Sequence, residues 1–263
     1  VVILITAIGF WIFFNHKPKI QKKTDSLYTD ALNAMLKADK RRAVSLLRDV
    51  VKQDSDHIDA YLQLGNILRD EEPQRALKIH QMLTVRPNLN KTTKVDIYKS
   101  LAMDYEVIGD LIKARKEAEQ ILIIDKQNEW GITFLLKIGE KIEDWDYAAD
   151  KAKQLQKIIG VSDTNNLAKY IVYKSNEKIK QNDFEEAESL LNKAINQFPK
   201  FGLPYKYLGD IRMMNRDLVK AIEYWEKFIN LSPEESYLVF DNMESALFDL
   251  GRYSEVENFY RKV

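Results

Sequence analysis

Side chains that could support catalysis or bind a metal are few and scattered in this sequence. It contains no cysteine and 3 histidines, His16, His57 and His80, so disulfides, thiolate metal sites and cysteine nucleophiles are excluded. A glycine-rich phosphate loop and the motifs of serine hydrolases and zinc proteases are also missing. His80 shares its helix face with no second ligand, which favours a packed core histidine over a metal ligand. We therefore predict no catalytic residues, no metal site and no cofactor.

Polar residues recur at positions that we expect to line the inner, concave face of a helical array. Asparagine and lysine side chains there can hold an extended peptide by its backbone or by a carboxylate. A solvated face explains the same residues equally well, because most polar surfaces only contact water. The candidate partner-binding residues are Asn33, Asn66, Arg69, Lys99, Met103, Lys206, Asp210 and Met213.

The overall charge excludes one class of partner. Lys and Arg number 40 and Asp and Glu number 40, which gives a formal net charge of zero. A nucleic-acid-binding domain normally carries a basic excess. We therefore expect other proteins, and not nucleic acid, as partners.

Residues 203–233 predict the elements that position these side chains. They contain Tyr205, the pair Leu208-Gly209, then Ala221, Trp225 and Pro233. This spacing is typical of the tetratricopeptide repeat, a helix–turn–helix unit of about 34 residues. Small residues at positions 209 and 221 let the two helices cross closely, and the proline ends the second helix because it lacks an amide hydrogen.

The same residue types recur along the chain at a similar interval. The small-residue position of each repeat falls at 43, 76, 114, 148, 187 and 221, and valine takes it at 256. A single repeat cannot bury its apolar face alone, so the repeats must stack on one another. We predict an all-α fold, a right-handed superhelical tetratricopeptide-repeat solenoid of about seven helix pairs over residues 26–263.

The first residues predict a membrane segment. Residues 1–14 carry no charge, and a membrane-spanning helix needs about 20 apolar residues. The alternative is the apolar part of a cleaved signal peptide, but no small-x-small cleavage site follows Phe14. We therefore predict a transmembrane anchor over residues 1–16, followed by a basic juxtamembrane linker over residues 17–25.

The linker carries Lys17, Lys19, Lys22 and Lys23 before or beside its only acid, Asp25. Lysine accumulates on the cytoplasmic side of membrane helices. We expect a single-pass protein with its amino terminus outside and its repeats in the cytoplasm. Contact of these lysines with anionic lipid heads is a second role, compatible with the first.

Residues 61–83 match one known family more closely than they match the general repeat motif. The segments Leu64-Gly65-Asn66, Arg75-Ala76 and Ile79-His80-Gln81, together with Arg69, resemble a repeat of the lipopolysaccharide assembly protein B family. This resemblance covers about the first half of the chain, and the later repeats match only the general motif. It implies a bacterial inner-membrane adaptor with cytoplasmic repeats. Family members end in a rubredoxin-like zinc module with paired CxxC motifs, for which this sequence has no cysteine.

Two functions follow from this interpretation. The resemblance implies an adaptor that presents an enzyme of lipid A biosynthesis, a deacetylase, to a membrane-bound AAA+ protease. The alternative is a structural subunit of a larger membrane complex. An adaptor should hold a peptide transiently in its groove, whereas a structural subunit should have apolar contacts of several thousand Å².

Overall fold

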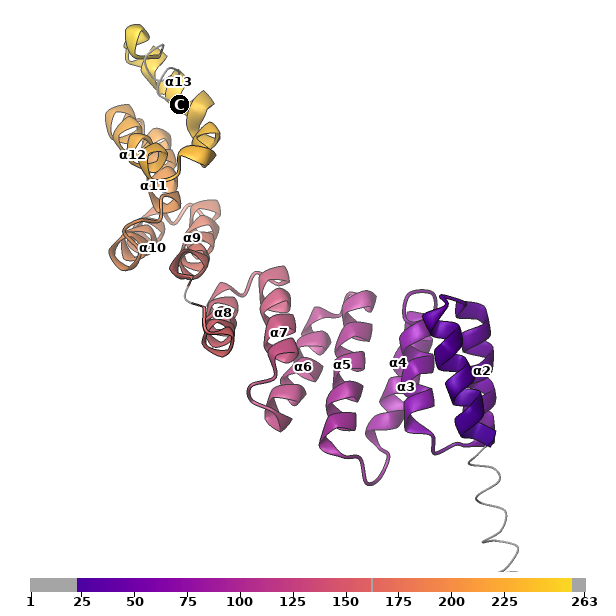
Figure 1. Cartoon of the computed structure of the whole chain (residues 1–263). Helices are drawn as coiled ribbons and strands as arrows, with labels where there is room; N and C mark the ends of the chain where they lie inside the picture. Colours follow the sequence, from indigo (N-terminus) through magenta and orange to yellow (C-terminus); the bar gives the residue numbers. More distant parts are fainter. Residues whose placement is uncertain (1–22, 162, 257–263) are drawn as a thin grey trace, which may run out of the picture. The chain divides into compact units, whose positions relative to one another are not determined.

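The computed structural model describes residues 23–161 and 163–256 (Figure 1), and there it consists of helices joined by short turns, with no strand in these ranges. The predicted all-α array of helix pairs is confirmed. The first helix covers residues 23–36. The helices that follow are α2 (Lys40–Gln53), α3 (Ile58–Leu68), α4 (Pro73–Thr84), α5 (Lys91–Ile108), α6 (Leu111–Ile124), α7 (Glu129–Lys141), α8 (Trp145–Ile159), α9 (Thr164–Lys180), α10 (Phe184–Gln197), α11 (Leu203–Met214), α12 (Leu218–Leu231), the 3-10 helix η1 (Pro233–Val239) and α13 (Phe240–Asp249).

The chain forms two compact units. The first unit ends at Phe134 and the second begins at Leu135. The anchor predicted over residues 1–16 and most of the linker lie outside the described residues. Within residues 23–161 and 163–256, no helix is both long enough and apolar enough to cross a membrane. The anchor and the superhelical path of the solenoid therefore stay predictions.

The turn inside a helix pair is built in the same way in most repeats. The residue two positions before the second helix adopts a positive φ, and the next residue is an aspartate whose carboxylate accepts the backbone N–H of the residue three positions on. This aspartate satisfies one of the amides that the first helical turn leaves without a partner. The positive-φ residues are Ala38, Gly109, Glu143, Asn182 and Arg216, and the capping aspartates are Asp39, Asp110, Asp144, Asp183 and Asp217.

One of these turns carries a removable strain. Glu143 is exposed and has a φ of 58°, a left-handed conformation that costs a residue with a Cβ about 1–2 kcal/mol. We expect Glu143→Gly to raise the free energy of unfolding above that of Glu143→Ala by about 1 kcal/mol. Denaturant unfolding of the two variants measures this difference. Equal stabilities would contradict the strain.

In the first unit, a glycine lets α3 and α4 pack closely. A Cβ built at Gly65 would lie 2.3 Å from Nε2 of His80 on α4, so no larger residue fits without displacing the histidine ring. The core around this crossing is made of small and branched side chains, because the helices must interdigitate. Its buried members are Ala31, Leu47, Val50, Ala60, Leu64, Leu68 and Ala76.

In the second unit, the predicted crossing of α11 and α12 is confirmed. A Cβ at Gly209 would lie 2.4 Å from Nε1 of Trp225, and Ala221 is fully buried beside them. Phe228 and Val239 continue this core. Pro233 follows the end of α12 and begins η1, in agreement with the expectation that it ends the helix.

The crossing predicts the effect of a larger side chain at position 221. Ala221→Leu adds three carbon atoms at a site with no exposed surface, and such overpacking costs about 1–3 kcal/mol. Glu223→Gln, an exposed change on the same helix, should cost under about 0.5 kcal/mol. The measurement is the unfolding free energy of both variants. A small and equal loss of unfolding free energy in the two variants would contradict the close packing at Ala221.

Candidate functional site: a polar groove in the first unit

Four of the predicted partner-binding residues come together in a groove of the first unit. The groove lies between α3 and α5, the first helices of two successive repeats, and has a volume of about 320 Å³. Its lining combines amides, both signs of charge and two apolar side chains. The residues are Leu62, Gln63, Asn66, Arg69, Asp96, Lys99, Ser100 and Met103.

A buried ionic network supports this groove from below. Arg69 Nε donates to Asp104 Oδ1 at 2.6 Å, and the other carboxylate oxygen of Asp104 bonds Nδ1 of His80. Nε2 of His80 lies 3.2 Å from the Leu62 carbonyl oxygen. His80 and Asp104 are fully buried and Arg69 is 7% exposed. The prediction of a packed core histidine at position 80 is therefore confirmed.

The guanidinium of Arg69 is already held by other groups of the protein. Its guanidinium is held by Asp104, by Asn66 Oδ1 at 2.6 Å and by the Ser100 carbonyl at 3.4 Å. A guanidinium that is paired and nearly buried cannot also reach far into solvent for a ligand. We infer that Arg69 positions Asn66 and links α3 to α5, while its direct contact with a partner stays a prediction.

The orientation of Asn66 is fixed by the same contacts. Its Oδ1 accepts from Arg69 Nη2 at 2.6 Å and from Ser100 Oγ at 3.0 Å. Because the oxygen is used twice, the amide nitrogen is the atom left to face the groove. In the described part of the chain this nitrogen has no protein acceptor, so it can donate to a carbonyl of a bound segment.

Lys99 places a positive charge at the side of the groove. Its Nζ lies 4.9 Å from the ring centroid of Trp130, and that ring stacks on Phe134 with a centroid distance of 4.9 Å. An aromatic face holds an ammonium group without neutralising it. Among the residues that the structure describes, no carboxylate forms an ion pair with Lys99. The charge is therefore oriented and available to a carboxylate of a partner.

The other predicted site residues lie elsewhere. Asn33 is exposed on the helix of residues 23–36 and does not line this groove. Lys206 and Asp210 form a 2.7 Å ion pair along α11, in the second unit, where Asp210 also accepts from Trp225 Nε1 at 3.1 Å. Met213 packs against the core of that unit. A binding role for these four residues stays a prediction.

The basic flank is described only at its end. Lys23 is exposed and helical at the start of the helix over residues 23–36. Lys17, Lys19 and Lys22 lie outside the described residues, so their predicted role beside a membrane is untested.

Sequence reasoning missed three residues that shape the groove: Ser100, Asp104 and Trp130. A signal for Asp104 was present, because it falls between Leu101 and Tyr105 in the buried stripe of α5. An acid at such a position needs a buried partner. His80, which takes the aromatic position of its repeat, is that partner. No comparable sequence pattern indicated Trp130, because it belongs to a different repeat from Lys99, which it contacts.

Comparison with known proteins extends the resemblance found in the early repeats. Lipopolysaccharide assembly protein B of Escherichia coli (strain K12) is 22% identical over 267 residues, which cover 99% of this chain and 69% of the relative. The protein of the same name from Haemophilus influenzae is 27% identical over 252 residues, covering 91% and 63%. The chain is a tetratricopeptide-repeat protein distantly related to lipopolysaccharide assembly protein B. The relationship covers nearly the whole chain, and not only its first half.

Two further findings complete the comparison. No protein-family model matches the chain. A chain in the structure of Naa15/Naa10 bound to HypK-THB superposes with a TM-score of 0.51 at 14% identity, covering 91% of this chain and 36% of that one. This likeness concerns the fold alone. These 263 residues hold no cysteine, so they include no thiolate zinc module.

Proposed function

We propose that the protein is a membrane-anchored scaffold that binds other proteins through the groove between α3 and α5 and catalyses no reaction of its own. The observation that carries this proposal is the pairing of an oriented amide, Asn66, with an unneutralised cation, Lys99, in one groove. An amide donor and an ammonium group recognise a peptide backbone and a carboxylate.

The groove suits an extended segment that carries an acidic group. Asn66 Nδ2 donates to a backbone carbonyl, and Lys99 pairs with an acidic side chain or a terminal carboxylate. Leu62 and Met103 add apolar side chains to the lining of the groove. The Arg69–Asp104 pair holds Asn66 in place before binding, and such preorganisation reduces the entropy lost when a partner binds.

A more specific proposal concerns the cellular process in which this scaffold acts. The relatives are named for lipopolysaccharide assembly, and the chain spans 69% and 63% of their lengths. We propose an adaptor of the bacterial inner membrane that presents an enzyme of lipid A biosynthesis to a membrane AAA+ protease. The anchor over residues 1–16 would hold the cytoplasmic repeats beside that protease, since confinement to a membrane raises the effective concentration of a second membrane protein.

Reversing the charge of Lys99 tests the groove. Lys99→Glu should lower partner recovery about tenfold or more, because a lost charge-assisted contact is worth roughly 1.5 kcal/mol or more. The measurement is co-purification of partners with the full chain in detergent. Lys116→Glu, on the exposed face of α6, is the matched charge reversal and should leave recovery unchanged. Equal recovery with both variants would place the binding surface outside the groove.

A separate measurement tests the adaptor role. An adaptor for proteolysis controls the amount of its client, so deletion of the protein should raise the level of the lipid A deacetylase in cells. An unchanged level would contradict the adaptor. The structural-subunit alternative would then account for partner binding.

A further inference from the structure

We propose that one edge of the first unit, where α4 ends and α5 begins, docks on the surface of a membrane that contains anionic lipids. We call it the α4–α5 edge and define it as residues 82–94 with the last turn of α6, residues 120–124. The inference rests on the proposed membrane anchor and adds a second, peripheral contact with the bilayer.

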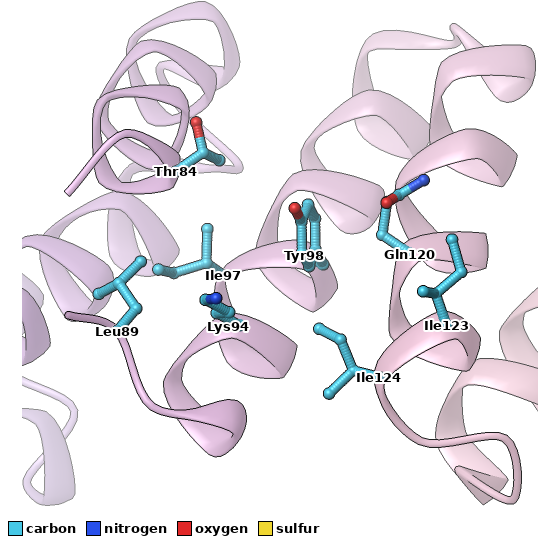
Figure 2. A pocket seen from close by; sticks show the side chains of 8 residues that line it. All are labelled: Thr84, Leu89, Lys94, Ile97, Tyr98, Gln120, Ile123 and Ile124. Carbon is cyan, nitrogen blue, oxygen red and sulfur yellow. The ribbon is translucent and has the colours of Figure 1, made fainter. Parts of the chain in front are cut away.

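An apolar pocket opens at this edge. Its volume is about 310 Å³, and Figure 2 shows its lining side chains coming from the end of α4, from the segment that leads into α5, from the first turns of α5, and from the end of α6. Aliphatic and aromatic groups predominate, with a lysine among them. The residues are Thr84, Leu89, Lys94, Ile97, Tyr98, Gln120, Ile123 and Ile124.

Large apolar side chains stand exposed around the pocket. Val85 is 82% exposed, Ile123 is 71% exposed and Met82 is 55% exposed. Single exposed apolar residues are ordinary, but a group of them beside an apolar hollow marks an interaction surface. Insertion among lipid headgroups would remove this area from water.

The charge of the same edge favours an anionic surface. Residues 85–95 contain Arg86, Lys91 and Lys94 and no acid. Arg86 pairs with Asp56 at 3.0 Å, whereas Lys91 and Lys94 are exposed and enter no ion pair within the described residues. Lysines close to a bilayer are attracted by anionic headgroups.

Two acids in the turns next to this edge accept backbone N–H groups. Asp54 Oδ1 accepts the Asp56 backbone N–H at 2.9 Å, and Asp125 Oδ1 accepts that of Gln127 at 3.2 Å. Both carboxylates close turns of the chain and do not neutralise Lys91 or Lys94.

The order of the helices places the start of the helix over residues 23–36, which follows the proposed anchor in sequence, at this edge. Successive helices run in opposite directions, so the start of the helix over residues 23–36 lies at the same end as the carboxyl ends of α2, α4 and α6. The connection between α4 and α5 forms the lower edge of the first unit in Figure 1. The six residues 17–22 can span at most about 20 Å when fully extended. An anchor over residues 1–16 would thus keep the α4–α5 edge close to the bilayer.

The opposite edge of the same unit provides a contrast. Ile112 there is 67% exposed, but it lies at the end of the unit that carries Asp70, Glu71, Glu72 and Asp110. Three of these acids are paired with cations of the same edge, Glu71 with Lys40, Glu72 with Arg75 and Asp110 with Lys113. The two edges therefore share exposed apolar groups, and the apolar pocket lies at the α4–α5 edge.

The absence of cysteine from the sequence permits a direct test. Single-cysteine variants of the full chain, Val85→Cys and Ile123→Cys, are labelled with the fluorophore NBD and reconstituted in phosphatidylcholine vesicles with or without phosphatidylglycerol. Ile112→Cys is the matched control. We expect a blue-shifted emission and a several-fold stronger quenching by brominated lipid at positions 85 and 123 when phosphatidylglycerol is present. Raised salt should reduce the effect by screening.

A charge reversal completes the test. Lys91→Glu with Lys94→Glu should abolish the lipid-dependent shift at position 85, while Lys91→Arg with Lys94→Arg should retain it. The reversal leaves folding intact, because acids are favourable in the first turn of a helix. Equal responses at positions 85 and 112, or no dependence on phosphatidylglycerol, would overturn docking. Loss of vesicle co-flotation by the unaltered chain would instead overturn the anchor, so the two failures are distinguishable.

Discussion

Replacing Asp104 with alanine is expected to lower the free energy of unfolding of the first unit by about 3–5 kcal/mol, the cost of breaking a buried ion pair. Asp104 is fully buried and is the common partner of Arg69 and His80. Its removal leaves the Arg69 guanidinium, which is 7% exposed, without a counter-charge. The loss should exceed that of any single exposed ion pair, because water cannot replace the missing carboxylate.

The measurement is denaturant unfolding of the full chain in detergent. Asp96→Ala is the matched control, since Asp96 is an exposed acid two turns earlier on α5, and it should cost under about 0.5 kcal/mol. Asp104→Asn keeps the volume and one acceptor oxygen but loses the charge and the second acceptor, so it should fall between the two. A loss at Asp104→Ala no larger than at Asp96→Ala would show that the buried network does not hold α3, α4 and α5 together.

Trp225→Ala is expected to have a similar effect in the second unit, about 3–5 kcal/mol for truncation of a large buried aromatic side chain. Trp225 is fully buried between α11 and α12, and its Nε1 donates to Asp210 Oδ1 at 3.1 Å. Truncation removes the ring that fills the space beside Gly209 and leaves a cavity.

A comparison with Trp225→Phe separates packing from the hydrogen bond. Phenylalanine keeps much of the ring volume and loses the donor, so it should cost clearly less than alanine. Both variants are followed through the unfolding transition of the second unit by circular dichroism. Equal losses would mean that the indole N–H, and not the packing against Gly209, stabilises the crossing.

Features decided by neighbouring residues could be predicted from the sequence. Gly209, Ala221 and Trp225 lie within one repeat, and the close crossing they predict is present. The same holds for Gly65 and His80. Small residues at a fixed interval constrain helix packing directly, so the repeat pattern predicts the helix pairs.

Features that depend on contacts between repeats could not be predicted in the same way. Arg69 and Asp104 are 35 positions apart in sequence, and their pairing depends on how α3 and α5 stack. From the sequence alone, Arg69 is interpreted as a cation that faces the groove. In the structure it donates a hydrogen bond to Asn66 and holds that side chain in place. Lys99 and Trp130 likewise meet only because α5 and α7 belong to adjacent repeats.

Site-specific photo-crosslinking in living cells tests the central claim most directly, namely that the groove between α3 and α5 holds a partner protein. A benzophenone amino acid is placed at Gln63, which lines the groove, and separately at Lys116 on the exposed face of α6. We predict a discrete crosslinked protein at position 63, absent at position 116 and lost when Lys99→Glu is added. The same product at both positions, or a product at position 63 that persists with Lys99→Glu, would contradict the groove as the binding site.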